Sequence, residues 1–375
     1  MTDARRLREL FLLEPDVVFL NHGSFGACPR PVFEEYQRWQ LELERRPVEF
    51  LGDRLAGLLD DVRAELGRYV GADPANLVLV PNATAGLNMV ARSLALAPGD
   101  EILTTDREYG AIDLLWQFVA GKTGARIVRR ALTAGAGLVD DLFAGTTDRT
   151  RVVSVSHVTS ATALVLPVGD ICRRARDAGI LGVVDGAHGP GQVPLDLKLL
   201  GADVYAGNCH KWLCSPKGAA FLHVRPEHQP WIEPHVLSWD WGREEAFAAR
   251  HRWQGTRDPA AHLAVPAAIA FQDEHGWPDV RSRCHALADQ ARRALAEVTR
   301  QPPLAPDETW LAQMVATPLP QDTDAEELKR RLREERRVEV AANDWNGIPT
   351  LRASFQGYND EEDLGRLVAA LDELL

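Results

Sequence analysis

Short apolar segments alternate with segments of helical patterning between residues 77 and 224. NLVLV, RVVSVSHV and LGVVD are three of the apolar segments. Because nearly every residue in them is apolar, they resemble strands that helices cover on both faces of a parallel sheet. The alternation therefore predicts an α/β fold with a mostly parallel central sheet flanked by helices.

After about residue 255 the pattern changes to longer helical stretches. One helix is expected over residues 259–276, and another runs from Val280 to Val298. VEVAA and TLRASF follow as short strands, and a last helix begins at Glu361. Near the N-terminus, residues 3–14 have the pattern of a short amphipathic helix.

The domain organisation follows from this change of pattern. We predict a large α/β domain over residues 20–255 and a smaller α+β C-terminal domain over residues 256–375. The N-terminal segment 1–19 is expected to join the smaller domain. After it, VVFLNHGSFG is expected to form a strand that runs into a glycine-containing turn.

Charge and cysteine content exclude several kinds of partner. The formal net charge of −12 argues against nucleic acid or an anionic membrane as the main partner. No apolar run reaches transmembrane length, and the N-terminus lacks a signal-peptide core. The five cysteines have no framework spacing, which is typical of reduced thiols in a cytoplasmic protein. CHKWLC has no second ligand pair, so no metal site is expected.

Open α/β sheets bind ligands beyond the carboxyl ends of their strands, and polar residues occur at two such ends. In PNATAG, residues 81–86, small residues and the Thr84 hydroxyl could bind a phosphate at a helix N-terminus, or could only cap that helix. Asp185 follows four apolar residues, where an acid must find a partner. That partner could be a protonated pyridine nitrogen or the backbone amides around it.

Two further strand ends carry a lysine and an aromatic residue. The chain has only five lysines, yet Lys211 and Lys217 lie close together in GNCHKWLCSPKG, and Lys211 is the nearer to the strand DVYAG. A lysine beside a phosphate and a protonated ring can lose its proton and condense with an aldehyde. In the same segment, Asn208 and His210 could bind the phosphate or orient the amine. Tyr109 could stack on a flat heteroaromatic ring or could belong to the core.

The order of these features is more informative than any one of them. A phosphate-binding turn is followed by an aromatic residue, by an acid at a strand end, and then by a lysine. This order predicts an enzyme that holds pyridoxal 5'-phosphate as a Schiff base on Lys211, with Asp185 at the pyridine nitrogen.

The sequence resembles the class V aminotransferase family of pyridoxal phosphate enzymes, within fold type I, and especially its isopenicillin N epimerase-like members. The resemblance extends over essentially the whole chain and is carried by LNHGSFGACP (20–29), NATAGLN (82–88), EYGAID (108–113), SHVTSATALVLPV (156–168), VVDGAHGPGQVPLDL (183–197), GNCHKWLCSPKG (207–218), WQGTRD (253–258) and LRASFQGYN (351–359).

The resemblance implies roles for individual residues. Lys211, Asp185 and Tyr109 would be catalytic. The expected cofactor-binding set is Ala83, Thr84, Tyr109, Ser160, Asp185, His188, Asn208, His210, Lys211 and Thr256. Thr256 would reach the phosphate of the neighbouring subunit, which implies a homodimer with shared sites. The expected substrate-binding residues are Arg352, for the α-carboxylate, and Asn21, His22 and Ser24.

Several reactions at the α-carbon remain open at this point. Epimerization or transamination of an amino acid is the first hypothesis, and a C–S β-lyase acting on a sulfur-containing amino acid is the alternative. Cysteine desulfurases of the family that this sequence resembles carry a nucleophilic cysteine shortly before the carboxylate-binding arginine. No cysteine lies between Cys284 and Arg352, so desulfuration through a persulfide is not expected unless Cys28 approaches the site from the N-terminal loop.

Two readings from other classes are set aside. A non-catalytic pyridoxal phosphate-binding regulator usually adds a DNA-binding module, and only about 20 residues precede LNHGSFG. A dinucleotide oxidoreductase is rejected because Pro190 interrupts the run of Gly186, Gly189 and Gly191, and no G-x-G-x-x-G follows the first strand.

Overall fold

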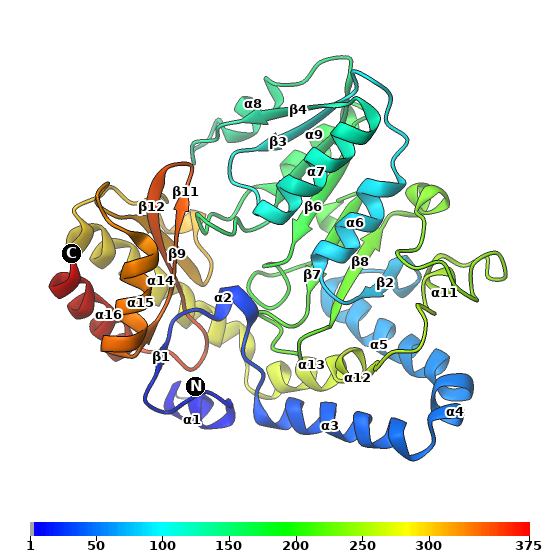
Figure 1. Cartoon of the computed structure of the whole chain (residues 1–375), viewed down its shortest axis with the longest axis horizontal. Coiled ribbons are helices and arrows are strands. Elements are labelled where there is room, and N and C mark those ends of the chain that lie inside the picture. Colours follow the sequence, from blue (N-terminus) through cyan, green and yellow to red (C-terminus); the bar gives the residue numbers. More distant parts are fainter. Residues whose placement is uncertain (1–3) are drawn as a thin grey trace.

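A seven-stranded sheet forms the centre of the computed structural model, which describes residues 4–375 (Figure 1). Along the sheet the strand order is β2-β8-β7-β6-β5-β3-β4. All strands run in one direction except β8, which is antiparallel to both of its neighbours, so the predicted mostly parallel sheet is confirmed. The strands are β2 (Leu77–Val80), β3 (Glu101–Thr105), β4 (Arg126–Arg130), β5 (Thr150–Ser156), β6 (Leu181–Gly186), β7 (Val204–Asn208) and β8 (Ala220–Val224).

Helices cover both faces of this sheet, as its apolar strands require. In β2, Leu77 and Leu79 belong to one core, whereas Val78 and Val80 belong to another, because side chains alternate along a strand. The first core includes α5 (Leu55–Val70) and α9 (Val168–Asp177), and the second includes α6 (Ala83–Ser93) and α7 (Gly110–Thr123). The smaller elements of this part are η2 (Pro74–Asn76), α8 (Leu138–Phe143), α10 (Leu197–Leu200), η3 (Pro226–Trp231) and α11 (Phe247–Arg250).

A group of helices packs along the lower edge of the molecule in Figure 1. There, α12 and α13 contact α3 and α5. The single helix expected over residues 259–276 is two helices, because Pro266 lies in the first turn of the second and cannot donate a backbone hydrogen bond. The helices of this group are α3 (Arg30–Arg45), α4 (Pro47–Glu49), the π-helix η1 (Phe50–Arg54), α12 (Ala260–Leu263) and α13 (Val265–Glu274).

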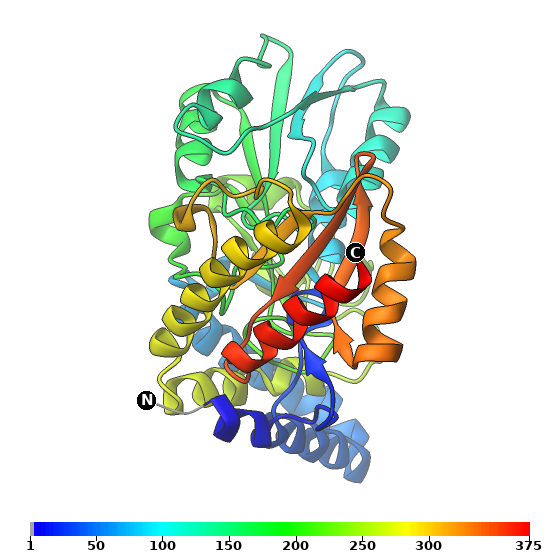
Figure 2. The same cartoon turned by 90° about the vertical axis from the view of Figure 1, so that its left-hand side faces the viewer.

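The C-terminal part contains a separate antiparallel sheet of order β11-β12-β9 (Figure 2). Two elements of this C-terminal part, the strand β9 and the helix α15, are not predicted by the sequence pattern. The elements are α14 (Trp277–Thr299), η4 (Glu308–Trp310), β9 (Met314–Pro318), α15 (Ala325–Arg336), β10 (Val338–Glu339), β11 (Ala341–Trp345), β12 (Ile348–Ser354) and α16 (Glu361–Leu374). Among residues 4–375, no helix is long and apolar enough to cross a membrane.

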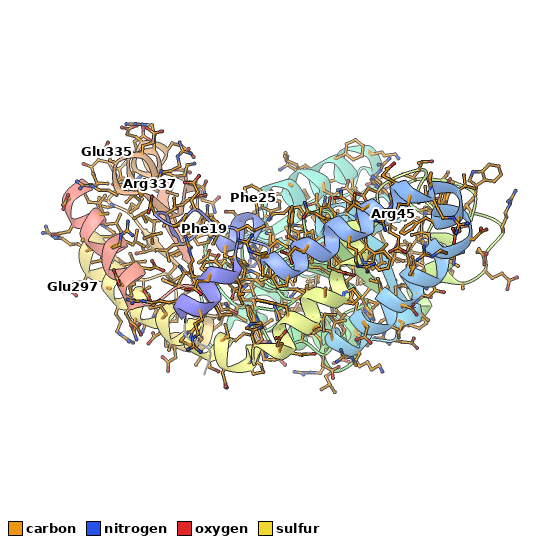
Figure 3. The ribbon with its side chains drawn as sticks, turned by 90° about the horizontal axis from the view of Figure 1, so that it is seen from below. Phe19, Phe25, Arg45, Glu297, Glu335 and Arg337 are labelled. Carbon is orange, nitrogen blue, oxygen red and sulfur yellow. The ribbon has the colours of Figure 1, made fainter. Side chains whose placement is uncertain are left out.

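The N-terminal segment lies against the C-terminal part and then enters the middle of the molecule. The helix expected over residues 3–14 is α1 (Ala4–Leu10), and residue 3 lies outside the described residues. The next strand, β1 (Val18–Phe19), pairs in parallel with β10. The expected turn after it is the short helix α2 (His22–Phe25), and Phe25 lies between the two parts of the molecule in Figure 3.

Gly26 ends α2 with a φ of 72°. A side chain at this position would meet the backbone oxygen of His210 at 2.0 Å. The glycine therefore lets the N-terminal segment pass directly against the main chain that carries Lys211.

Candidate active site

A cavity of about 240 Å³ lies at the carboxyl ends of the parallel strands, where open α/β sheets bind their ligands. Its walls come from α2 and from the loops that follow β2, β3, β5, β6 and β7. The residues predicted from the sequence that line it are Ser24, Thr84, Tyr109, Ser160, Asp185, His188, Asn208, His210 and Lys211.

The amine of Lys211 forms a hydrogen bond with the ring of His188. Its Nζ lies 3.1 Å from Nε2 of His188, and Nδ1 of His188 accepts a hydrogen bond of 3.2 Å from the indole Nε1 of Trp212. An indole nitrogen can only donate, so the proton of the neutral His188 ring lies on Nε2 and points at the lysine. Burial lowers the pKa of His188 well below its ordinary value and the pKa of Lys211 to about 8. The arrangement favours a neutral, nucleophilic amine.

Asp185 is a buried acid that no cation of the described residues pairs with. It is 5% exposed, and its Oδ1 accepts a hydrogen bond of 2.9 Å from the backbone nitrogen of Ala187. Burial raises the pKa of this carboxyl above its ordinary value, and the nearby Lys211 partly opposes the shift. A cationic group in the cavity would satisfy Asp185.

The N-terminus of α6 forms the phosphate-binding candidate. Asn82 caps this helix by accepting from the backbone nitrogen of Ala85, and Thr84 lines the cavity in its first turn. The Ala83 amide, predicted to bind the phosphate, donates to Oδ1 of Asn208 at 2.8 Å. The Ala83 amide thus orients the side chain of Asn208, which lines the cavity. His210 donates from Nδ1 to the Ala219 carbonyl at 3.2 Å, and burial lowers its pKa to about 4.

Arg352 extends the site toward the C-terminal sheet. Its guanidinium donates to the Ser160 carbonyl at 2.6 Å and to the Ser24 hydroxyl at 3.0 Å, while its buried Nε has no partner. Arg352 is 6% exposed, and burial lowers its pKa to about 10. No carboxylate of the described residues lies within ion-pair distance, so this buried cation is available to an anionic ligand.

His22 does not line the cavity, although the sequence suggested that it faces the substrate. It is fully buried: its Nε2 lies 3.0 Å from the Lys211 carbonyl and its Nδ1 lies 2.9 Å from the Tyr358 hydroxyl. Because a carbonyl only accepts, Nε2 donates and Nδ1 accepts from the tyrosine. His22 therefore holds the main chain of Lys211 from behind and is a positioning residue.

The other predicted residues lie at the edge of the site or away from it. Tyr109 is 48% exposed and borders both the cavity and its extension toward Arg352, which Asn21 also lines. Thr256 is exposed on the loop before α12 and does not line the cavity of its own chain.

Glu108 supports the site from behind, through Ser156, and is a residue that the sequence reasoning missed. It follows β3, next to Tyr109, and accepts hydrogen bonds from the hydroxyls of Thr105 at 2.6 Å and Ser156 at 2.7 Å. Ser156 lines the cavity and pairs in register with Asp185. Desolvation raises the pKa of Glu108 to about 7, and the charge of Asp185 adds to the shift. The only sequence signal was an acid three residues after the end of a strand.

Replacing Glu108 with glutamine is expected to stabilise the cofactor-free protein more at pH 8 than at pH 5. The pKa of Glu108 in the folded protein, about 7, lies above its ordinary value, so the native state holds its proton more tightly than the unfolded state does. The contribution of Glu108 to stability is therefore present at low pH and lost as the pH rises through 7. Urea unfolding of Glu108→Gln and wild type at both pH values measures the difference.

Glu101→Gln is the matched control. Glu101 lies at the other end of β3, where it accepts from the hydroxyls of Thr147 and Thr150. An equal gain in both variants between pH 5 and pH 8 would contradict an effect specific to the neighbourhood of Asp185.

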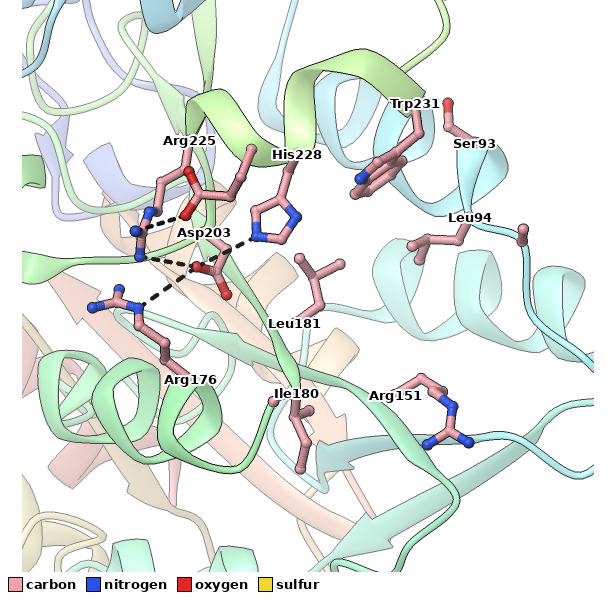
Figure 4. Close-up of a pocket in the computed structure, with 13 residues that line it drawn as sticks. Ser93, Leu94, Arg151, Arg176, Ile180, Leu181, Asp203, Arg225, His228 and Trp231 are labelled. Atoms are coloured by element: carbon pink, nitrogen blue, oxygen red, sulfur yellow. Dashed lines mark hydrogen bonds and ion pairs between the residues drawn. The ribbon is translucent and has the colours of Figure 1, made fainter.

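A second cavity of about 580 Å³ lies at the opposite edge of the sheet, beside the first residue of β6 (Figure 4). Its charged groups satisfy one another: Asp203 lies within ion-pair distance of Arg176, Arg225 and His228. It contains no lysine and lies at the amino ends of the parallel strands, away from Lys211. The candidate active site is therefore the smaller cavity.

A comparison with known protein families decides the assignment. The family model described as Aminotransferase class-V matches residues 29–367. The chain belongs to the class-V aminotransferase family. It is 40% identical to the isopenicillin N epimerase of Streptomyces clavuligerus, over 100% of this chain and 99% of that protein. It is 29% identical to a probable chloroplastic L-cysteine desulfhydrase of Arabidopsis thaliana, over 96% of this chain and 84% of that protein.

Solved structures agree with this family. A cysteine desulfurase of Escherichia coli superimposes with a TM-score of 0.85 at 26% identity, and each chain is covered completely. A C-DES variant with glycine linked to the PLP cofactor superimposes with a TM-score of 0.88 at 23% identity. The predictions of fold type I, of a pyridoxal phosphate cofactor and of an enzyme acting at the α-carbon of amino acids are confirmed.

The residues of the cavity fit this cofactor. Asp185 lacks a cationic partner, and a protonated pyridine ring would provide one. Lys211 offers an amine with a lowered pKa to an aldehyde, and the positive end of α6 with the Thr84 side chain in its first turn suits a phosphate. Each of the three polar ends of pyridoxal phosphate thus has a complementary group in one cavity.

Proposed function

We propose that the chain is an epimerase that inverts the α-carbon of an amino-acid-derived substrate. One observation carries the proposal: a lysine amine with a lowered pKa shares a cavity with Asp185, and the unpaired guanidinium of Arg352 borders the extension of that cavity. The 40% identity to an isopenicillin N epimerase over the full chain favours epimerization over transamination.

Within this proposal each residue of the cavity has a task. When bound, pyridoxal phosphate supplies an aldehyde that takes up an amino group and a ring that withdraws electrons from the α-carbon. Asp185 would keep the ring nitrogen protonated, and Tyr109 would lie against the ring. The residues proposed to hold the remaining polar groups are Ser160 and His188 at the phenolic oxygen, and Ala83, Thr84, Asn208 and His210 at the phosphate.

Arg352 and Lys211 act on the substrate in this scheme. Arg352 binds the α-carboxylate through a guanidinium that has no competing carboxylate. Lys211 Nζ takes the proton from the α-carbon on one face, and His188 Nε2 orients that amine. Inversion then needs a proton from the opposite face, supplied by a water or a second acid. Asn21 and Ser24, which hydrogen-bond to each other at 2.6 Å, shape the substrate side of the cavity.

The second candidate is a C–S β-lyase, which the likeness to an L-cysteine desulfhydrase favours. A persulfide mechanism has less support. None of the five cysteines lines the cavity or its extension, and burial raises the pKa of Cys28 on the N-terminal segment to about 12.

We also propose a cytoplasmic homodimer. The exposed Thr256 would contribute to the partner's cofactor site, since it lies away from the cavity of its own chain. The absence of a disulfide among the five cysteines is compatible with a reducing compartment.

The test is to incubate the cofactor-loaded protein in deuterium oxide with L-amino acids and, separately, with cysteine sulfoxides. We expect deuterium at the α-carbon together with loss of chirality, because Lys211 exchanges its proton with solvent. Mass spectrometry and chiral chromatography measure both. Formation of pyruvate with release of a sulfur species would reject the epimerase in favour of the lyase.

A further inference from the structure

Inversion requires one group that takes a proton from the α-carbon and another that gives a proton to its opposite face. Lys211 is the first of these groups in the proposed function. The α-carbon joins the amino group, which reacts in the cavity that Lys211 lines, to the carboxylate, which Arg352 binds in the extension of about 410 Å³. The second group must therefore lie where the cavity and its extension meet.

Five of the described residues line both the cavity and its extension. They are Ser24, Phe25, Tyr109, Ser160 and Lys211. Phe25 has no exchangeable proton. A serine hydroxyl is a weak acid unless a base lies beside it, and both of these hydroxyls accept from the guanidinium of Arg352, which cannot serve as a base. Tyr109 remains as the partner of Lys211.

The strand order places these two residues on opposite sides of Asp185. Lys211 follows β7, Asp185 lies in β6 and Tyr109 follows β3, and in the sheet β6 lies between β7 and β3 (Figure 1). Because these strands are parallel, their carboxyl ends lie at the same edge of the sheet. A group bound beside Asp185 is therefore approached by the amine from one side and by the phenol from the other.

The phenol of Tyr109 is free to exchange protons. Tyr109 is the N-cap residue of α7, yet its side chain caps no backbone group, and its hydroxyl has no hydrogen-bond partner among residues 4–375. The hydroxyls of the other four tyrosines each bond another side chain. Since Tyr109 is also 48% exposed, solvent can replace a proton that its phenol gives away.

We propose that Tyr109 is the second acid of the reaction and that its phenol gives a proton to the α-carbon on the face opposite Lys211. This assignment rests on the proposed epimerase function. The bond between the α-carbon and its hydrogen breaks, the proton goes to Lys211 Nζ, and the electron pair stays with the substrate. That pair then forms a bond to the proton of the Tyr109 hydroxyl, which becomes a phenolate. Solvent returns a proton to the phenolate and takes one from the lysine, and the two residues exchange roles in the reverse direction.

Glycine tests this assignment, because it has one α-hydrogen on each face and no side chain that a pocket could reject. The cofactor-loaded protein is incubated with glycine in deuterium oxide, and NMR of a chiral derivative measures the exchange of each α-hydrogen. We expect wild type to exchange both. In Tyr109→Phe one hydrogen should exchange as in wild type, whereas exchange of the other should slow by about 10²-fold or more, which is the range of a lost acid–base group.

Cofactor binding gives a second readout that does not depend on turnover. Phenylalanine keeps the ring and removes only the hydroxyl, so Tyr109→Phe should keep the affinity of wild type for pyridoxal phosphate and its visible absorption band. Tyr109→Ala should lower that affinity by about 10-fold, because an aromatic contact is lost. An equal loss of affinity in both variants would assign the hydroxyl to cofactor binding and would overturn the proposal.

Tyr36→Phe is the matched control. Tyr36 lines neither the cavity nor its extension, and its hydroxyl accepts from Gln40 at 2.9 Å, so this variant should exchange both hydrogens. Fast exchange of both hydrogens in Tyr109→Phe would make water the donor and overturn the proposal, as would exchange of a single hydrogen by wild type. Exchange of neither hydrogen by wild type would instead reject the proposed function, and this role of Tyr109 with it.

Discussion

Replacing Lys211 with alanine is expected to abolish covalent attachment of pyridoxal phosphate and to lower turnover by about 10³-fold or more, which is the range of a lost acid–base group. Lys211 is the lysine of the cavity, and its amine accepts a hydrogen bond from Nε2 of His188. Borohydride reduction followed by peptide mass spectrometry locates the attachment site. The visible absorption band of the loaded protein gives an independent readout.

Lys217→Ala is the control for Lys211→Ala. The amine of Lys217 donates to the Gly26 carbonyl at 3.0 Å and does not line the cavity. This variant should keep the covalently attached cofactor. Attachment at Lys217 in the Lys211→Ala protein would contradict the assignment of the anchor.

Replacing Asp185 with asparagine is expected to change activity and stability in opposite directions. Turnover should fall by about 10²-fold or more, because an amide does not hold the ring nitrogen protonated and preorganised charge of this kind is worth that much. The folded-state pKa of Asp185 is raised by burial, so its ionised carboxyl destabilises the native state once the pH exceeds that pKa. The cofactor-free variant should therefore unfold at a higher temperature than wild type at pH 8.

Asparagine suits this test because its Oδ1 can still accept from the backbone nitrogen of Ala187. The stability gain should shrink as the pH falls toward the ordinary aspartate value of 3.8, because below that value the carboxyl of the wild type is protonated in both the folded and the unfolded state. Wild-type turnover in Asp185→Asn, or a cofactor-free variant that is less stable than wild type at pH 8, would contradict the role given to this acid.

The central sheet could be predicted because its strands are short, apolar and separated by helices. The C-terminal sheet could be predicted only in part. The segment Met314–Pro318 becomes a strand through pairing with β12, and the local sequence pattern does not predict this long-range contact. The charged α15 has few apolar residues, and its burial against β11 is likewise a tertiary effect.

The candidate site could be predicted where a reactive side chain lies at or shortly after the end of a strand, as Asp185 and Lys211 do. His22 shows the limit of such reasoning: its ring bonds the Lys211 carbonyl and the Tyr358 hydroxyl, which are distant in sequence. Glu108 was missed because it lies in a polar run whose burial depends on Ser156 of a neighbouring strand.

The bond from His22 to the Lys211 carbonyl fixes the main chain of the lysine, while Nζ meets His188 at its other end. The proposed base is thus a flexible side chain on a main chain that a buried hydrogen bond holds in place. The torsions of the lysine side chain, together with its contact with His188, therefore determine where the amine lies relative to the α-carbon.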